Sequence, residues 1–332
     1  MVDFTRALDK HLDTVSRRRR GLPAPQVLVH SQSRGIDYSY GDRAQPFHAA
    51  SIGKVVTAAL VMDLVPLDTT VQSILGPQPG LLLGDATVGQ LLEHTSGAAD
   101  YFDDPVTSGP KFQKLIASER DRLWTPADLL EFSRSRQKPV GMPGEKFHYS
   151  DTGYVLAGRI AEELTGQPFH ELVRSRIFEP LGMANSWYPH RESGPAIAPL
   201  WLGRDELSTA VSVSCDWAGG GIATTLDDLV RLSAGIQSLE ARAEMARMRN
   251  RFRPGMRYGA GLMELRFEEF FPLLRGMPRP TGHIGVLATH MFYDADNDTH
   301  FAMNFHSTRE MVRSFKTLIF IEQLLAKTPE RV

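Results

Sequence analysis

The chain has 332 residues, of which 42% are hydrophobic and 23% charged, and its formal net charge is −2 at pH 7. This length and composition allow a large core, and the near-neutral charge gives no electrostatic basis for binding nucleic acid or an acidic membrane surface. The single cysteine, Cys215, excludes an intrachain disulfide, and we interpret it as a small packed residue.

The amino-terminal segment predicts an amphipathic helix, because Phe4, Leu8, Leu12 and Val15 recur at helical spacing. The arginine run 17–20 is interpreted as the solvated end of this helix, where cations complement the helix dipole. The sequence shows no secretory signal and no run of the ~18 apolar residues that a membrane span needs. We therefore expect a cytoplasmic protein without a membrane span, although a protein trimmed of a leader would look the same.

Two short strands are predicted next, at 26–30 and 36–40. The chain is then almost continuously apolar over 55–65, which is typical of a buried helix. Ser51 would stand at the start of this helix and Lys54 one turn later, on the same helix face.

Ser51 and Lys54 form a Ser-x-x-Lys pair, in which an amine beside a hydroxyl can activate it as a nucleophile. The same four residues also fit an N-capping serine followed by a solvated lysine. The apolar helix favours the catalytic interpretation, because desolvation lowers the pKa of a lysine towards that of a usable base. The helix amino terminus would also favour negative charge that develops near Ser51.

The stretch from about 66 to 199 is predicted to be mostly helical, with proline and glycine punctuation. One helix begins after Thr125, with Pro126 at its first position, and another covers 154–164 and stops at Gly166.

The carboxy-terminal third predicts strands at 258–267, 285–293 and 298–306, with a turn at 294–297 between the last two. Apolar residues at helical spacing over 311–325 predict a closing amphipathic helix.

These elements predict an α/β fold of the α+β type. An antiparallel sheet would be assembled from both ends of the chain and flanked by the amino- and carboxy-terminal helices, with an inserted, mostly helical lobe. We expect a single domain over 1–332, with the α/β lobe at about 1–65 and 205–332 and the helical lobe at about 66–204.

Two later segments complete the pattern that Ser51 and Lys54 begin: Tyr149-Ser150-Asp151 and His283-Ile284-Gly285. In this order and at these separations the chain resembles the serine β-lactamase and penicillin-binding-protein-like hydrolases. The resemblance is closest to the branch that holds class C β-lactamases, D,D-carboxypeptidases, D-aminopeptidases and esterases with a β-lactamase fold. The segments 91–97, 180–183 and 219–225 support it, so it extends from about 47 to 306 and implies a β-lactamase-like fold.

The resemblance also implies roles for individual residues. Ser51 would be the acylated nucleophile, and Lys54 and Tyr149 would share its proton. A tyrosine hydroxyl titrates near 10, so Tyr149 needs a neighbouring cation such as Lys54 to act as a base at neutral pH. His283 would orient the substrate or support Tyr149.

Further residues are implied to bind substrate. The backbone N–H groups of Ser51 and Val286 would form the oxyanion hole. Gly285 would keep the strand free of a side chain that obstructs the substrate. Tyr101 and the adjacent Phe102 would either wall the pocket or pack in the core.

Two positions depart from the β-lactamase pattern. His283 stands where many β-lactamases have a lysine, and a histidine is mostly neutral at pH 7, so recognition of a carboxylate-bearing antibiotic is put in doubt. Asp151 replaces an asparagine, and an ionised aspartate only accepts hydrogen bonds. We consider two hypotheses for Asp151: it pairs with Lys54 and shifts the base role to Tyr149, or it favours substrates with a free amine.

The sequence thus predicts a serine hydrolase that works through an acyl-enzyme, as an esterase, amidase or D-peptidase on small acyl substrates. The alternatives are a class C-like β-lactamase, an acyltransferase, and a sensor that is acylated by penicillin or peptidoglycan fragments without turnover. No metal or organic cofactor is expected, since the four carboxy-terminal histidines (283, 290, 300, 306) match no familiar ligand spacing. The expected partner is a small ester, amide or peptide rather than nucleic acid, and the sequence does not indicate the oligomeric state.

Overall fold

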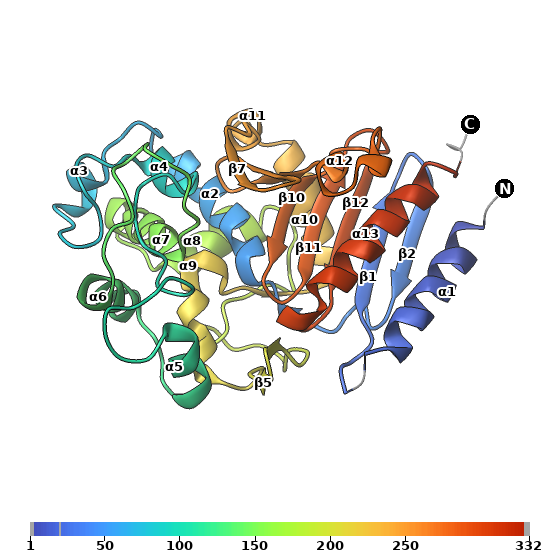
Figure 1. Cartoon of the computed structure of the whole chain (residues 1–332), viewed down its shortest axis with the longest axis horizontal. Helices are drawn as coiled ribbons and strands as arrows, with labels where there is room; N and C mark the ends of the chain where they lie inside the picture. The colour runs from blue at the N-terminus through green and yellow to red at the C-terminus, as the bar shows by residue number, and fades with distance from the viewer. Residues whose placement is uncertain (1–2, 20, 329–332) are drawn as a thin grey trace.

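The computed structural model describes residues 3–19 and 21–328. Its centre is an eight-stranded sheet of order β2-β1-β12-β11-β10-β9-β8-β7 (Figure 1). Strand β1 (Gln26–Ser31) pairs antiparallel with β12 (Thr299–Asn304), so the two ends of the chain share one sheet. This confirms the predicted antiparallel sheet.

The other strands of this sheet are β2 (Ile36–Tyr40), β7 (Asn250–Arg253), β8 (Met256–Tyr258), β9 (Met263–Leu265), β10 (Thr281–Gly285) and β11 (Thr289–Asp294). Two small antiparallel pairs lie outside it: β3 (Phe47–His48) with β6 (Ala223–Thr224), and β4 (Trp201–Leu202) with β5 (Asp205–Glu206).

Two predicted strands were wrong in their extent. The segment 258–267 is divided between β8 and β9, because the chain turns at Gly261, whose φ of 79° lies in the left-handed region. The segment 285–293 is divided between β10 and β11 by a turn in which Ala288 has φ 59°. Strand β10 therefore ends with His283, Ile284 and Gly285, whereas the sequence analysis placed this motif at the start of a strand.

The terminal helices α1 (Phe4–Arg17) and α13 (Met311–Leu325) lie together on one face of the sheet, as predicted, while α10 (Leu226–Gln237) covers the other (Figure 1). Neighbouring residues of β12 show the two faces. Phe301 packs in the cluster that holds α1 and α13, whereas Ala302 packs in the cluster that holds α10.

Most remaining helices gather at one end of the sheet around α2 (Gly53–Leu64), which packs directly against α7 (Asp151–Thr165). The capped starts and stops were predicted correctly: Thr125 caps α6 (Pro126–Arg136) through a capping box, and Gly166 ends α7 in the left-handed conformation. The other helices are α3 (Val71–Leu75), α4 (Val88–Leu92), α5 (Phe112–Ser118), α8 (Phe169–Val173), α9 (Trp217–Gly220), α11 (Arg242–Met245) and α12 (Phe267–Phe270). Within the described ranges, no helix combines the length and apolarity that crossing a bilayer requires. The division into two lobes stays a prediction.

The arginine run does not simply face solvent. Arg17 and Arg18 are exposed, and Arg20 lies outside the described residues, but Arg19 is only 3% exposed. Its Nε donates to Glu310 Oε2 at 3.0 Å, which ties the end of α1 to the start of α13. The solvated interpretation is therefore wrong for Arg19, because the partner carboxylate comes from a segment far along the chain.

Replacing Arg19 with alanine is expected to lower the free energy of unfolding by roughly 3 kcal/mol, because it leaves the buried Glu310 carboxylate without this partner. Urea denaturation of wild type, Arg19→Ala and the exposed control Arg18→Ala measures this. The control should change stability by less than ~0.5 kcal/mol. An equally small change in Arg19→Ala would contradict the assigned ion pair.

Candidate active site

The candidate nucleophile lies in a tight turn rather than in a regular helix. Ser51 is the middle residue of a 3₁₀ turn (Ala50–Ile52) that leads directly into α2. The preceding Ala50 has φ 51°, a left-handed conformation that is uncommon for residues other than glycine. A side chain at Gly220 would come within 2.6 Å of the Ala50 carbonyl, so α9 can pack against this turn only through a glycine. Backbone strain of this kind gathers at functional sites.

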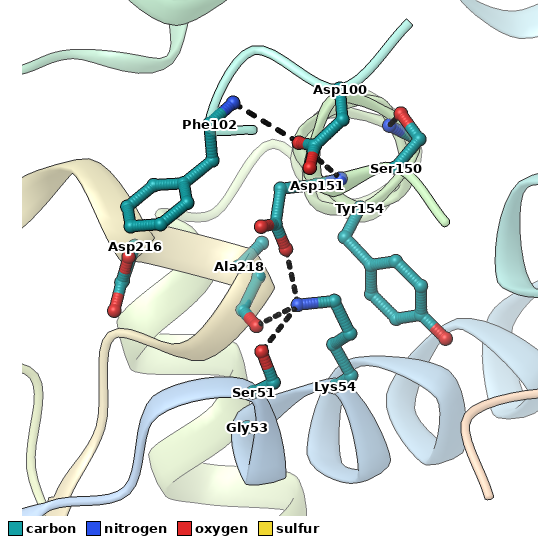
Figure 2. Close-up of polar contacts among 12 residues, drawn as sticks. Ser51, Gly53, Lys54, Asp100, Phe102, Ser150, Asp151, Tyr154, Asp216 and Ala218 are labelled. Atoms are coloured by element: carbon teal, nitrogen blue, oxygen red, sulfur yellow. Dashed lines mark hydrogen bonds and ion pairs between the residues drawn. The ribbon is translucent and has the colours of Figure 1, made fainter. Parts of the chain in front are cut away.

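Lys54 connects the first two motifs. Its side chain is fully buried, and Nζ donates to Ser51 Oγ at 3.2 Å and to the Gly219 carbonyl at 2.6 Å. Nζ also forms an ion pair with Asp151, the first residue of α7. Figure 2 shows the Lys54 side chain reaching between Ser51 and Asp151. The structure thus contains the ion pair considered in the first hypothesis for Asp151.

The pKa of Lys54 is opposite to the expectation from sequence. Burial alone lowers this pKa, but Asp151, followed by Tyr149, outweighs burial and holds the pKa above its usual value. The expectation drawn from the apolar helix was wrong because Asp151 of α7 supplies a partner carboxylate, which is the pairing that the first hypothesis for Asp151 considered. Lys54 therefore rests as an ammonium group.

Tyr149 lies beside this ammonium, with Nζ of Lys54 5.1 Å from the centre of its ring. Burial raises the pKa of the Tyr149 hydroxyl; Lys54 opposes that shift and Asp151 reinforces it. Both candidate bases consequently hold a proton in the resting site. Activation of Ser51 requires one of them to release its proton.

His283 lies behind the site and does not line the cavity. Its ring is fully buried, and Nδ1 donates to the Ile284 carbonyl at 2.8 Å, so Nε2 is left to accept from the Tyr258 hydroxyl at 3.0 Å. Tyr258 in turn meets the Tyr149 ring edge-on, with ring centres 6.1 Å apart. The geometry favours support of Tyr149 over contact with substrate, and Tyr258 carries no sequence motif that would have revealed it.

A cavity of about 470 Å³ opens over the nucleophile and brings most predicted site residues together. Its lining includes Ser51, Tyr149, Asp151, Gly285 and Val286. Because it holds both a candidate nucleophile and an exposed strand end, it is the candidate substrate site.

Tyr101 is not part of this lining. It is 1% exposed, and its hydroxyl donates to the Cys215 carbonyl at 2.8 Å, so the aromatic ring packs in the core. The adjacent Phe102 lines the cavity instead. Cys215 is itself buried and free, as expected.

Gly285 is required by the packing of the protein itself, and its expected clearance for substrate stays a prediction. A Cβ at this position would lie 2.1 Å from Thr289 Oγ1 and 2.6 Å from the Ala49 carbonyl oxygen. The glycine therefore allows β10 to pack against the turn that carries Ser51. This packing requirement does not depend on a bound substrate.

Sequence reasoning missed the acidic residues of the cavity. Asp100, Asp103, Asp104 and Asp216 all line it beside Asp151. The close spacing of the aspartates at 100–104 could have indicated an acidic site, whereas no sequence pattern near Asp216 indicated a site residue. No group of three potential metal ligands was found among residues 3–19 and 21–328.

Comparison with known proteins places these features in context. A family model described as Beta-lactamase matches residues 41–325. Penicillin-binding protein 4 of Amycolatopsis lactamdurans is 37% identical over 151 residues, which cover 42% of this chain and 35% of that protein. The chain therefore matches only about a third of the length of this relative.

Two solved structures match nearly the whole chain. The D-amino acid amidase from Ochrobactrum anthropi SV3, complexed with D-phenylalanine, has a TM-score of 0.80 at 22% identity and covers 99% of this chain and 100% of that chain. A D-stereospecific amidohydrolase from Streptomyces sp. has a TM-score of 0.77 at 24% identity and covers 93% of this chain and 98% of that chain. At these identities the likeness concerns the fold, and it confirms the expected β-lactamase-like class.

Replacing Asp151 with asparagine is expected to move the rising limb of the pH–rate profile to lower pH. Asp151 raises the pKa of both Lys54 and Tyr149, so whichever of them acts as the base will lose its proton at lower pH without that carboxylate. The measurement is kcat/KM for p-nitrophenyl acetate across pH, with the exposed Asp68→Asn as a matched control. A limb at the same pH in all three proteins would contradict the assignment.

Proposed function

We propose that this chain, which belongs to the β-lactamase family, is a serine hydrolase that forms an acyl-enzyme on Ser51. The observation that carries the proposal is the hydrogen bond from Lys54 Nζ to Ser51 Oγ at the floor of an open cavity. A serine that merely caps a helix needs neither the cavity nor the buried ammonium group.

In the proposed reaction, Lys54 or Tyr149 first releases its proton to water. Ser51 Oγ then attacks the carbonyl carbon of an ester or amide while its own proton passes to that deprotonated group. The same proton then goes to the leaving group as the carbonyl–leaving-group bond breaks. Water repeats the attack on the acyl-enzyme, and the acid is released. The N–H groups of Ser51 and Val286 are proposed to stabilise the oxyanion, a role in which each donor contributes roughly 10²–10³ in rate.

The proposed substrates are small esters and amides, including D-amino-acid derivatives. The names of the two structural neighbours support amide and D-stereospecific chemistry. His283 adds a physical argument, since burial, with a smaller effect of Lys54, lowers its pKa to about 3 and keeps the imidazole neutral. A neutral, buried ring provides no cation for the carboxylate of a β-lactam, so a class C-like β-lactamase is the weaker alternative. A cytoplasmic location and hydrolysis in preference to acyl transfer remain predictions.

Replacing Ser51 with alanine should abolish turnover of p-nitrophenyl butyrate, lowering kcat by roughly 10⁴-fold or more, and should remove the acyl adduct. Steady-state rates and intact-mass spectrometry measure the two effects. The exposed Ser175→Ala provides a matched control that should retain both.

A wild-type adduct on Ser51 that forms without turnover would instead favour the penicillin or peptidoglycan-fragment sensor. Equal activity in wild type and Ser51→Ala would contradict the proposed function.

A further inference from the structure

The substrate cavity is strongly acidic. Among its described lining residues, Arg253 is the single lysine or arginine, and its guanidinium lies over the Phe252 ring at 4.9 Å. Five aspartates line the same cavity: Asp100, Asp103, Asp104, Asp151 and Asp216. A site of this composition favours positive charge on whatever enters it.

Two of these carboxylates already have strong partners within the protein. Asp151 is paired with the buried Lys54. Asp104 Oδ2 lies 2.7 Å from His148 Nε2, within hydrogen-bond distance. Neither carboxylate needs a ligand to compensate it.

Asp216 has no comparable partner in the described part of the chain. Its carboxylate lies 3.7 Å from His48 Nε2 and 3.7 Å from Cys215 Sγ, and the former distance is too long for a normal hydrogen bond. Burial lowers the pKa of His48 to about 4, so this histidine supplies no charge. Burial, reinforced by Asp151, raises the pKa of Asp216 to about 7.

Two further carboxyl groups lie on the same side of the cavity as Asp151. Figure 2 shows Asp100 next to Asp151, and Asp103 lines the same cavity. Asp100 is 3% exposed; its Oδ1 accepts from the N–H groups of Phe102 and Asp151, both at 3.1 Å. Its Oδ2 accepts no hydrogen bond from the described residues. Asp103 accepts only from the neutral amide of Gln113. Burial, followed by Asp151, raises the pKa of each carboxyl group.

Apolar side chains complete the cavity. They come from the loop after α4, from β7 and from the ends of β9, β10 and α13: Phe102, Phe252, Met263, Ile284, Met311 and Phe315. A hydrophobic or aromatic group would be desolvated against them. The cavity therefore combines an apolar wall with unpaired carboxylates.

We propose that the preferred substrate carries a protonated amine beside a hydrophobic group on its acyl portion, and that the ammonium binds at Asp216, with Asp100 and Asp103 adding negative potential. This inference rests on the proposed function, because it identifies the acyl group that Ser51 would receive. An ammonium group only donates hydrogen bonds and therefore suits carboxylates that lack donors.

The test compares two substrates that differ only in the amine: phenylalanine p-nitroanilide, as both enantiomers, and 3-phenylpropionic acid p-nitroanilide. Hydrogen bonds to charged groups predict a kcat/KM at least roughly tenfold higher for the better phenylalanine enantiomer. Asp216→Asn should bring this ratio down towards one, mainly by raising KM for the amine. The exposed Asp68→Asn, which removes one carboxylate away from the cavity, should leave the ratio unchanged.

Ser51-dependent turnover with a ratio of one or less in wild type would overturn the inference while leaving the proposed function intact. A high ratio that Asp216→Asn does not reduce would overturn the assignment of Asp216. If Ser51→Ala and wild type are equally inactive on both substrates, the p-nitrophenyl butyrate assay decides the proposed function, and calorimetry decides the inference. Phenylalanine amide should bind Ser51→Ala roughly tenfold more tightly than 3-phenylpropionamide; equal or weaker binding would overturn the proposal.

Discussion

The site depends on the buried ion pair between Lys54 and Asp151. It joins the start of α2 to the start of α7, while the Gly219 carbonyl in α9 accepts from the same ammonium group. Burying an amine is costly unless its charge and donors are matched, and here a carboxylate, a carbonyl and the Ser51 hydroxyl match them. The Lys54 side chain therefore connects Ser51 to α7 and α9, and its pairing with Asp151 holds it as an ammonium group.

The 3₁₀ turn that carries Ser51 (Ala50–Ile52) is also fixed by the backbone segments that pack against it. Gly220 approaches Ala50 from the α9 side, and Gly285 approaches Ala49 from the β10 side, each at a distance that a Cβ would make impossible. Thr289 Oγ1 adds a hydrogen bond to the Ala49 carbonyl at 2.9 Å. The sheet, built from both ends of the chain, thus provides one side of the turn and the helical region provides the other. This arrangement keeps Ser51 at the surface of the cavity although its neighbours are buried.

The charges around Ser51 follow a clear division. The Lys54 ammonium group is paired with Asp151, His283 is buried and neutral, and five aspartates and Arg253 line the cavity. A few side chains therefore decide the sign of the electrostatic potential in this cavity, and the fold alone does not.

The sequence by itself determined the elements with strong local signals. These include the buried helix after Ser51, the helix start after Thr125, the helix stop at Gly166 and the terminal helices. The sequence also singled out the motif residues Ser51, Lys54, Tyr149 and Asp151, which the structure brings together. Periodicity and capping are local properties, so they survive without knowledge of the fold. The turns that divide the strands at 259–262 and 286–288, the buried Arg19, the raised pKa of Lys54 and the acidic wall at Asp216 were decided only by tertiary structure. The turns follow from the local backbone conformations at Gly261 and Ala288, which the hydrophobic pattern did not reveal. The burial of Arg19, the raised pKa of Lys54 and the acidic wall each depend on groups from distant parts of the chain, so the neighbouring residues do not encode them.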